Sequence, residues 1–449
     1  MARRREETQL NAAKTSLIRW LLIFWLFVLS AVAYLDRVNI SVAGIVFAGE
    51  YGLSKIQLGW IFSAFLAGYA LFQTPGGRLA DKLGARRMLA LGVVWWGIFT
   101  ALTAAIPAQL SSALLAFLLV RFALGAGEAV IYPASNQFVA RWIPSAERGL
   151  ANGIIFSGVG AGAGFTPPLI AYIMLKYGWR WSFVICAILG LLAGLIWFLI
   201  ARNSPDEHPL VSPGELARIQ SGLPTSVEAK PALISWSSML CSRDLLAVTL
   251  SYFSFGYVAW IFFNWFFIYV AEVRGLNLKA SALYSMLPFI AMAICSPFGG
   301  VLSDRATRVR GARAGRCGIA FIAMILTAIF LIFGSRAENT RVAVLVLAGG
   351  AGALYLSQSS FWSVTADIGG RSSGAVSGFM NMGNQIGGMI TASLTPWIAS
   401  RFGWKAPFFV AAVLCLGGAV AWLFVDPLQR LDSAEAPLIF AESGLDKMP

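Results

Sequence analysis

Four charged side chains lie deep inside apolar stretches of the sequence, where a charge is costly and is usually retained for function. Asp36 and Arg37 interrupt one apolar run, and Arg121 and Glu128 lie in another. A guanidinium offers a planar fork of donors that suits a carboxylate. A carboxylate packed between helices can exchange a proton with its surroundings. These four residues could therefore bind an organic anion and carry a proton.

Their spacing assigns different tasks to neighbouring residues. Asp36 and Arg37 are about 100° apart on a helix and cannot face each other, whereas Tyr34 shares a face with Arg37. We expect Arg37 and Tyr34 to contact the anion, and Asp36 and Glu128 to carry the proton. Arg121 is seven residues before Glu128 and shares its face. Arg121 either contacts substrate and holds Glu128 ionised, or forms a purely structural pair with it; Arg37 and Asp36 could likewise form structural ion pairs with other helices.

Further polar side chains in apolar segments are costly unless they bond to a ligand or to a neighbouring helix. The stretches "AFLAGYALFQTPGG", "SQSSFWSV" and "GFMNMGNQIGG" each contain such groups. The additional candidates for substrate contact are Tyr69, Ser359, Trp362, Asn381 and Asn384.

The composition is that of a helical protein with many membrane spans. Of the 449 residues, 58% are hydrophobic and 12% are charged, which is about half the charged fraction of soluble domains. The five cysteines have no CxxC spacing, and the single histidine, His208, lies in a polar loop. The pattern gives no indication of a disulfide framework, a metal site or a histidine proton relay.

Twelve segments have the roughly 20 apolar residues that are needed to cross a bilayer. We place the spans near 17–46, 57–79, 88–106, 113–138, 150–174, 181–201, 245–271, 280–302, 316–334, 341–366, 373–399 and 405–425. The predicted organisation is a first six-helix bundle (1–201), a cytoplasmic linker (202–243), a second six-helix bundle (244–425) and a cytoplasmic tail (426–449).

The basic residues predict the orientation. With both termini in the cytoplasm, 23 Lys and Arg residues fall inside, nine fall outside and two are embedded, as the positive-inside rule requires. This distribution accounts for most of the net charge of +13, so no nucleic-acid partner is needed. We expect a multi-pass protein of a bacterial inner (plasma) membrane, surrounded by lipid.

The two halves of the sequence repeat. The stretch "PGGRLADKLGARR" (75–87) is similar to "FGGVLSDRATRVR" (298–310), and "KYGWRWSF" (176–183) is similar to "RFGWKAPF" (401–408). Both motifs recur at nearly the same offset along the chain. Parallel repeats of this kind are typical of transporters in which two halves rock around a site at their interface.

The charged residues of the first repeated motif are expected to control conformation. Asp81, with Arg86 or Arg87 nearby, can pair with the helix ends of spans four, five or eleven in one state and release them in another, and Arg141 and Arg148 are possible partners. Asp304 would act in the same way in the second half, with Arg305 or Arg308. The residues predicted for this gating are Asp81, Arg86, Arg87, Asp304 and Arg305.

Three motifs carry a resemblance to a known family. "GRLADKLGARR" resembles the loop signature of the major facilitator superfamily. "YLDRVNISVA" and "RFALGAGEAVIYP" resemble its anion:cation symporter branch, which includes hexuronate, glucarate, galactonate and phthalate permeases. The resemblance covers nearly the whole chain. It implies an all-α fold of twelve transmembrane helices in two pseudo-symmetric six-helix bundles, and proton coupling through Asp36 and Glu128.

One stretch departs from the sugar-acid members of this branch, which place an amide side chain on span five. Here the span reads "NGIIFSGVGAGAGFTPP", and only Ser157 and Thr166 are polar near its middle. A less hydroxylated or aromatic carboxylate therefore remains open as the substrate.

We therefore predict a secondary active transporter, not an enzyme, which brings an organic anion such as a sugar acid into the cell with protons by alternating access. We expect a monomer that needs no cofactor besides the coupling ion, and Na⁺ coupling stays open. An anion exchanger or a proton-driven exporter on the same fold is the alternative. A membrane-embedded enzyme or sensor is a remote one, because the sequence offers no embedded histidine and no nucleophile–base spacing.

Overall fold

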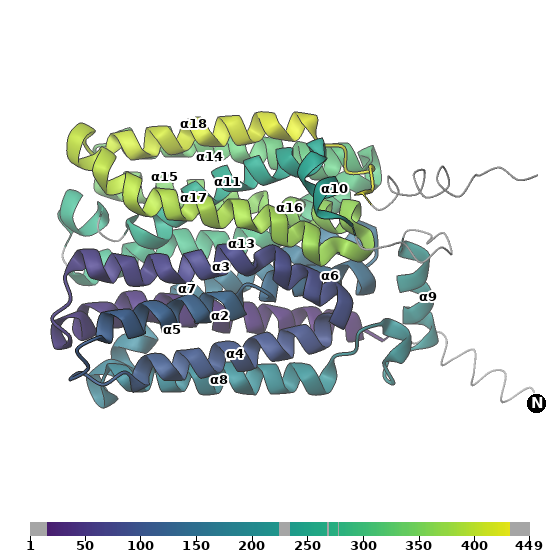
Figure 1. Ribbon diagram of the computed structural model, residues 1–449. Helices are drawn as coiled ribbons and strands as arrows, with labels where there is room; N and C mark the ends of the chain where they lie inside the picture. The colour runs from purple at the N-terminus through teal and green to yellow at the C-terminus, as the bar shows by residue number, and fades with distance from the viewer. Residues whose placement is uncertain (1–15, 224–233, 267–268, 277, 432–449) are drawn as a thin grey trace, which may run out of the picture.

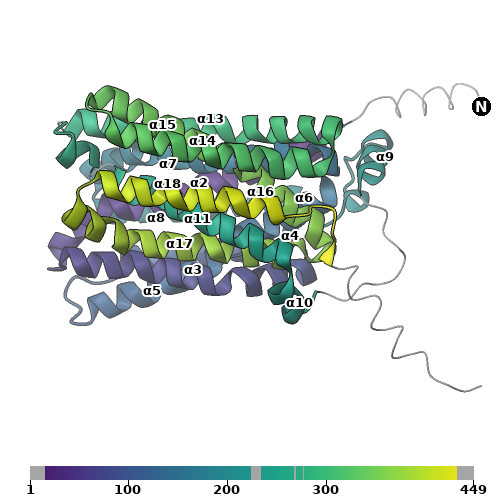
Figure 2. The ribbon, with the colours of Figure 1, turned by 90° about the horizontal axis from the view of Figure 1, so that it is seen from above.

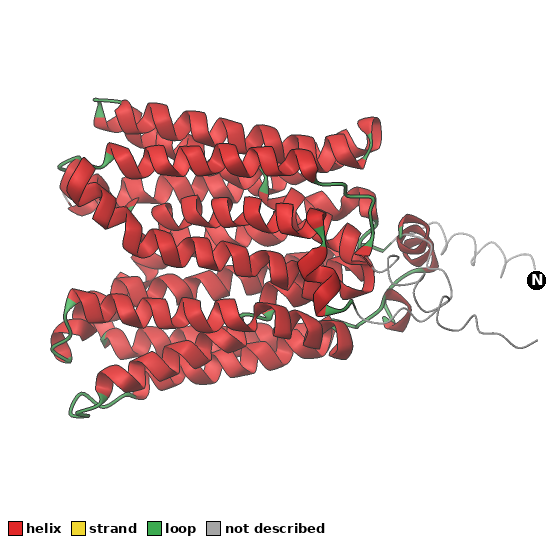
Figure 3. Ribbon diagram, turned by 45° about the horizontal axis from the view of Figure 1, so that its top comes forward, coloured by secondary structure: helices red, strands yellow, loops and turns green. Residues whose placement is uncertain are grey.

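The computed structural model describes residues 16–223, 234–266, 269–276 and 278–431, and within these ranges every regular element is a helix (Figure 3). Residues 1–15, part of the predicted linker (224–233) and most of the predicted tail (432–449) lie outside the described residues. The prediction of an all-helical protein is confirmed.

The helices form two groups, coloured purple to teal and green to yellow in Figure 1. The first bundle contains α2 (Ile18–Glu50), α3 (Lys55–Leu83), α4 (Ala85–Ala105), α5 (Ala113–Glu128), α6 (Ile131–Trp142), α7 (Arg148–Tyr177) and α8 (Trp179–Ile200). The second contains α11 (Arg243–Asn264), α13 (Leu278–Arg310), α14 (Ile319–Arg336), α15 (Thr340–Leu356), α16 (Gln358–Gly369), α17 (Ser373–Phe402) and α18 (Lys405–Ala421). The bundles meet along α7 with α13 and along α3 with α17.

Two short helices, α9 (Pro213–Gly222) and α10 (Trp236–Cys241), connect the bundles. Both lie at the same end of the molecule, as two views show (Figures 1 and 2). We call this end, which also carries Asp81 and Asp304, the linker end. The predicted orientation places it in the cytoplasm.

Ten segments of the described chain are long and apolar enough to cross a bilayer by length and composition. One of them, Thr340–Ala392, is long enough for two spans because it runs through α15, α16 and most of α17. The 29-residue α3 is not among the ten. The membrane-spanning helical fold is thus clear, while the count of twelve spans stays a prediction.

Predicted spans four and ten are each interrupted at the same place in the repeat. Helix α5 ends at Glu128 and α6 begins at Ile131; in the second half, α15 ends at Leu356 and α16 begins at Gln358. Interrupted helices occur at membrane depth where the backbone lies inside protein or lines a cavity. The break therefore places Glu128 at a helix end in the protein interior.

At the linker end, an aspartate from each bundle binds the first turn of a helix in the other bundle. Asp81 accepts N–H hydrogen bonds from Gly374 and Ala375 of α17, both at 2.9 Å. Asp304 accepts the equivalent bonds from two residues of α7, Gly149 at 2.9 Å and Leu150 at 2.7 Å. A carboxylate is favourable at a helix N-terminus because the N–H groups there lack partners in the helix. These contacts hold the bundles together, so the linker end is closed.

The basic partners of these aspartates differ from those expected. Asp304 forms an ion pair at 2.6 Å with Arg316, which follows α13 in the short helix η4 (Arg313–Gly318), and not with Arg305. None of the hydrogen bonds or ion pairs of the described chain joins Asp81 to Arg86 or Arg87. Arg86 instead donates to the carbonyl oxygen of Phe198 at 2.9 Å.

The reason lies in the direction of these side chains. Asp81 faces α17 of the other bundle, whereas Arg86 reaches along α4 to the end of α8. A third contact across the interface, between Arg148 and Asp367, lies beside Arg316. Asp81 and Asp304 thus contact helix ends as expected, while Arg316 pairs with Asp304 and Arg148 pairs with Asp367.

Gly77→Ala should open the linker end. A methyl group on Gly77 would overlap the carbonyl oxygen of Gly374 across the interface, and overpacking of this kind costs about 1–3 kcal/mol. This should move the equilibrium away from the closed state about five- to 150-fold. The test is maleimide labelling of Thr365→Cys, a buried position at the closed interface, in a chain whose native cysteines are replaced by alanine.

Gly417→Ala is the matched control, because nothing lies within 4 Å of a methyl group at that position. Labelling should rise with Gly77→Ala and stay unchanged with Gly417→Ala. Equal labelling of both variants would show that the contact between Gly77 and Gly374 does not limit opening.

Candidate functional site

A small cavity lies between the bundles and is lined from both of them. From the first bundle it is lined by Tyr34, Arg37, Tyr132, Phe156 and Val159. From the second it is lined by Tyr252, Phe255, Ala259, Trp260, Phe263, Tyr355, Gln358, Asn381, Asn384 and Gln385. Its volume of about 20 Å³ has room for little more than one water molecule. The bundles must therefore move apart before a carboxylate of several heavy atoms can enter.

Of the described residues that line this cavity, Arg37 is the single charged one. Its Nε donates to Oε1 of Glu128 at 2.9 Å, and this ion pair is almost fully buried. The guanidinium lies over the rings of Tyr34 and Tyr69, at 4.7 and 4.4 Å from their centroids. One of its terminal nitrogens, Nη2, has no hydrogen-bond partner among the described residues. Arg37 is thus held in place and still has donors for a ligand.

Asp36 points away from the cavity, as its position next to Arg37 on the helix predicts. Its Oδ2 accepts hydrogen bonds from Trp96 Nε1 at 3.0 Å and Thr100 Oγ1 at 2.7 Å, both on α4. Its Oδ1 has no partner in the described part of the chain, and the residue is fully buried. Asp36 therefore lies behind the cavity wall, between α2 and α4.

Arg121 is buried but does not pair with Glu128, although both lie on α5. Its guanidinium is 4.9 Å from the ring centroid of Phe65, and its Nε and Nη1 have no hydrogen-bond partner in the described structure. The structural pair between Arg121 and Glu128 is not formed: Glu128 bonds to Arg37 through Oε1, and its Oε2 has no partner among the described residues. Arg121 lies within the electrostatic influence of Asp36 and Glu128, so the four charges form one cluster.

Some of the other residues predicted to contact substrate line the cavity or touch Arg37, and others are buried away from it. Asn381 and Asn384 line the cavity and bond to each other at 3.2 Å. Tyr69 lies beneath the Arg37 guanidinium, and its buried hydroxyl has no partner among the described groups. Ser359 and Trp362 are buried outside the cavity lining in this state.

Sequence reasoning missed several polar residues of the cavity wall. Tyr252 accepts hydrogen bonds from Gln358 Nε2 and Trp362 Nε1, both at 2.9 Å. Gln358 and Gln385 each keep a buried amide oxygen without a partner within the described residues. Gln385 could have been identified from the sequence, because it lies one helical turn after Asn381 and so shares its face. Nothing in the sequence singles out Tyr252, because aromatic residues are common in every span.

Tyr252→Phe should destabilise the second bundle. It leaves the buried Trp362 Nε1–H and Gln358 Nε2–H without an acceptor, at a cost of about 1–3 kcal/mol. Thermal unfolding of the purified protein should show a lower midpoint than the wild type. Tyr177→Phe removes the hydroxyl of an exposed tyrosine and serves as the control. An equal fall in the unfolding midpoint of both variants would contradict the stabilising role of the Tyr252 hydroxyl.

Comparison with known proteins gives one family. The family model described as Major Facilitator Superfamily matches residues 26–392 and 313–443. A probable sulfoacetate transporter of Cupriavidus necator, SauU, is 34% identical over 406 residues, which cover 90% of this chain and 93% of that protein. The hexuronate transporter of Bacillus subtilis is 28% identical over 412 residues, which cover 90% and 94% of the two chains.

Solved structures show the same fold. The proton:xylose symporter XylE, bound to 6-bromo-6-deoxy-D-glucose, aligns with a TM-score of 0.72 at 16% identity and covers 92% of this chain and 98% of its own. FucP in its outward conformation aligns with a TM-score of 0.66 at 19% identity, with 91% and 98% coverage. At these identities the likeness concerns the fold alone.

Proposed function

Because this chain belongs to the Major Facilitator Superfamily, whose members are transporters and not enzymes, we propose that it moves a small organic anion into the cell together with protons. The observation that carries this proposal is the buried pair between Arg37 and Glu128 at the wall of the cavity between the bundles. It joins the one cation that faces the cavity to an acid that can hold a proton.

Competition for Arg37 would couple the two solutes. An entering carboxylate binds the guanidinium most strongly when Glu128 has released it, and protonation of Glu128 removes the charge that holds the pair together. Asp36 provides a second buried carboxylate close by, with one oxygen free of hydrogen bonds in the described structure. The loaded and protonated protein would then reorient by alternating access, and the closed linker end would open to the cytoplasm.

The α7 side of the cavity wall favours an anion with few hydroxyl groups. Helix α7 contributes Phe156 and Val159 to the lining, neither of which can hydrogen-bond a hydroxyl. The second bundle offers amides instead, from Asn381, Asn384 and Gln385. We propose a compact carboxylate or sulfonate with its anionic group on Arg37 and a polar tail toward these amides, closer to sulfoacetate than to a hexuronate. Sugar acids remain members of the substrate panel.

The remaining features of the proposal follow from this site. One chain builds the whole cavity, so a monomer suffices for transport. The described residues hold no cluster of His, Cys, Asp and Glu that could bind a metal ion, and H⁺ is proposed as the coupling ion. We propose a bacterial inner membrane protein with both termini on the cytoplasmic side, and the distribution of basic residues along the sequence supports this orientation.

Uptake by the purified protein in proteoliposomes tests this proposal. The panel holds labelled sulfoacetate, hexuronates, aldarates and a neutral sugar, with and without an imposed inward proton gradient. We expect gradient-stimulated uptake of one anion and none of the neutral sugar. Uptake only in exchange for an internal anion would show that the protein is an anion exchanger and not a symporter. Gradient-driven efflux of amphipathic compounds would show that it is an exporter.

A further inference from the structure

A second cavity lies at the linker end and shares no lining residue with the central one. Its volume is about 330 Å³, and three parts of the chain build it. The first bundle contributes Arg141 and Arg148, α9 contributes an apolar wall that includes Ile219, and the second bundle contributes Asp367 and Arg371. We propose that this cavity binds a multivalent oxyanion from the cytoplasm, and that the bound anion holds the linker end closed.

The charges around the cavity define the ligand. Four arginines line it, Arg141, Arg148, Arg371 and Arg430, against two acids, Asp206 and Asp367. Arg148 is paired with Asp367, whereas neither Arg141 nor Arg371 forms an ion pair in the described part of the chain. An anion with two negative charges would balance Arg141 and Arg371. Guanidinium forks match the oxygens of phosphate and carboxylate groups.

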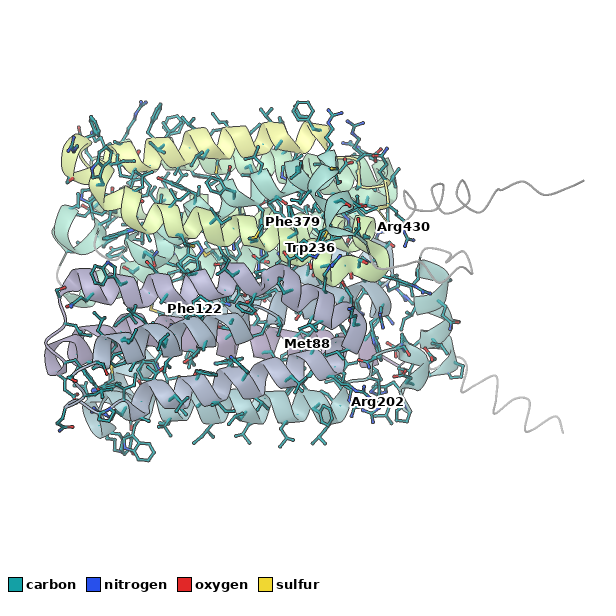
Figure 4. All side chains as sticks on the ribbon, viewed as in Figure 1. Met88, Phe122, Arg202, Trp236, Phe379 and Arg430 are labelled. Carbon is teal, nitrogen blue, oxygen red and sulfur yellow. The ribbon has the colours of Figure 1, made fainter. Side chains whose placement is uncertain are left out.

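The wall that α9 provides is fixed to the first bundle. Helix α9 is anchored by the fully buried Glu215, which accepts a hydrogen bond from the backbone N–H of Arg19 and one from its guanidinium, both at 3.1 Å. Arg19 also pairs with Glu147 at 3.3 Å. The cavity is therefore a built site with a defined wall, and Figure 4 shows Arg430 at this end of the molecule.

The position of the cavity gives the anion its effect. Arg141 and Arg148 belong to the first bundle, and Arg371 belongs to the second, so opening of the linker end pulls the site apart. A ligand that binds one state better than the other shifts the equilibrium toward that state. A cytoplasmic anion would thus slow the step that releases substrate, and would act as an inhibitor that does not compete at Arg37.

Calorimetric binding of pyrophosphate tests this inference without a transport substrate, so it stands apart from the proposed function. The protein is placed in nanodiscs of phosphatidylcholine. Arg371→Gln should weaken binding about tenfold or more, the effect of losing one charged hydrogen bond. Arg202→Gln removes a partly exposed arginine of the same end that donates only to backbone carbonyls, and should leave the affinity unchanged. Arg37→Gln should also leave it unchanged.

Two further measurements complete the test. Pyrophosphate should reduce maleimide labelling of Thr365→Cys, because the bound anion keeps the linker end closed. Nanodiscs that contain phosphatidic acid, whose phosphomonoester headgroup carries up to two negative charges, distinguish the source of the anion: weaker pyrophosphate binding there, in the wild type only, would support the site with a lipid headgroup as its occupant. Equal affinity of Arg371→Gln and the wild type, or no binding in either lipid, would overturn the proposal.

Discussion

Arg37→Gln should abolish uptake of the anion. Among the described residues, Arg37 is the single charged group on the wall of the central cavity. A pair of charge-assisted hydrogen bonds to a carboxylate contributes about 3 kcal/mol or more, which corresponds to at least about 100-fold in affinity. The rings of Tyr34 and Tyr69 lie against the guanidinium and hold it in place.

Arg37→Lys separates charge from geometry. An ammonium keeps the charge but loses the planar fork, so its affinity should fall between those of the wild type and Arg37→Gln. Binding of labelled anion to the purified protein and uptake into proteoliposomes measure both effects. Arg202→Gln, at the linker end, serves as the control for a lost arginine. Wild-type affinity in Arg37→Gln would remove Arg37 from the substrate site.

Glu128→Gln should uncouple uptake from the proton gradient while exchange of internal for external anion continues. Glutamine resembles the protonated acid and leaves Arg37 free for the anion, so the loaded protein can still reorient. It cannot release a proton, so the gradient no longer drives accumulation. Asp36→Asn should likewise reduce gradient-driven uptake, although Asp36 does not line the cavity. The expected loss in accumulation is complete for Glu128→Gln.

Glu50→Gln is the matched control for removal of a carboxylate. Glu50 pairs with Arg180 at 2.7 Å at the far end of α2, and hydrogen bonds from Arg180 lower the pKa of Glu50. It therefore stays ionised through the pH range of transport and should not take part in coupling. Undiminished gradient-driven accumulation in both Glu128→Gln and Asp36→Asn would exclude these acids as the proton carriers.

The fold was predictable because each membrane helix is a continuous segment of mostly apolar residues in the sequence. Runs of apolar residues define most spans, and two motifs that recur at nearly the same offset reveal the two halves. The exception is α3, a 29-residue helix that contains Gln73, Pro75 and Asp81 and is not among the ten apolar segments of the described chain. The directions of Asp36 and Arg37 also followed from local geometry, because adjacent residues on a helix cannot share a face.

The pairings in the site were not predictable, because they depend on how the helices pack. Arg37 and Glu128 are far apart in the sequence and lie on different helices, and Glu128 has a nearer candidate on its own helix in Arg121. Asp304 likewise binds Arg316, brought back by the turn after α13, and not its neighbour Arg305. Spacing along one helix says which residues share a face, but it does not say which partner the next helix provides.

Proton movement driven by the anion tests the central claim most directly. The protein is reconstituted into liposomes that contain a pH-sensitive dye, with no proton gradient imposed, and the anion identified by the uptake panel is added outside. The account predicts that the lumen acidifies as labelled anion enters, and that Glu128→Gln shows no acidification. Entry of labelled anion through the wild-type protein with no change in internal pH would contradict proton-coupled symport.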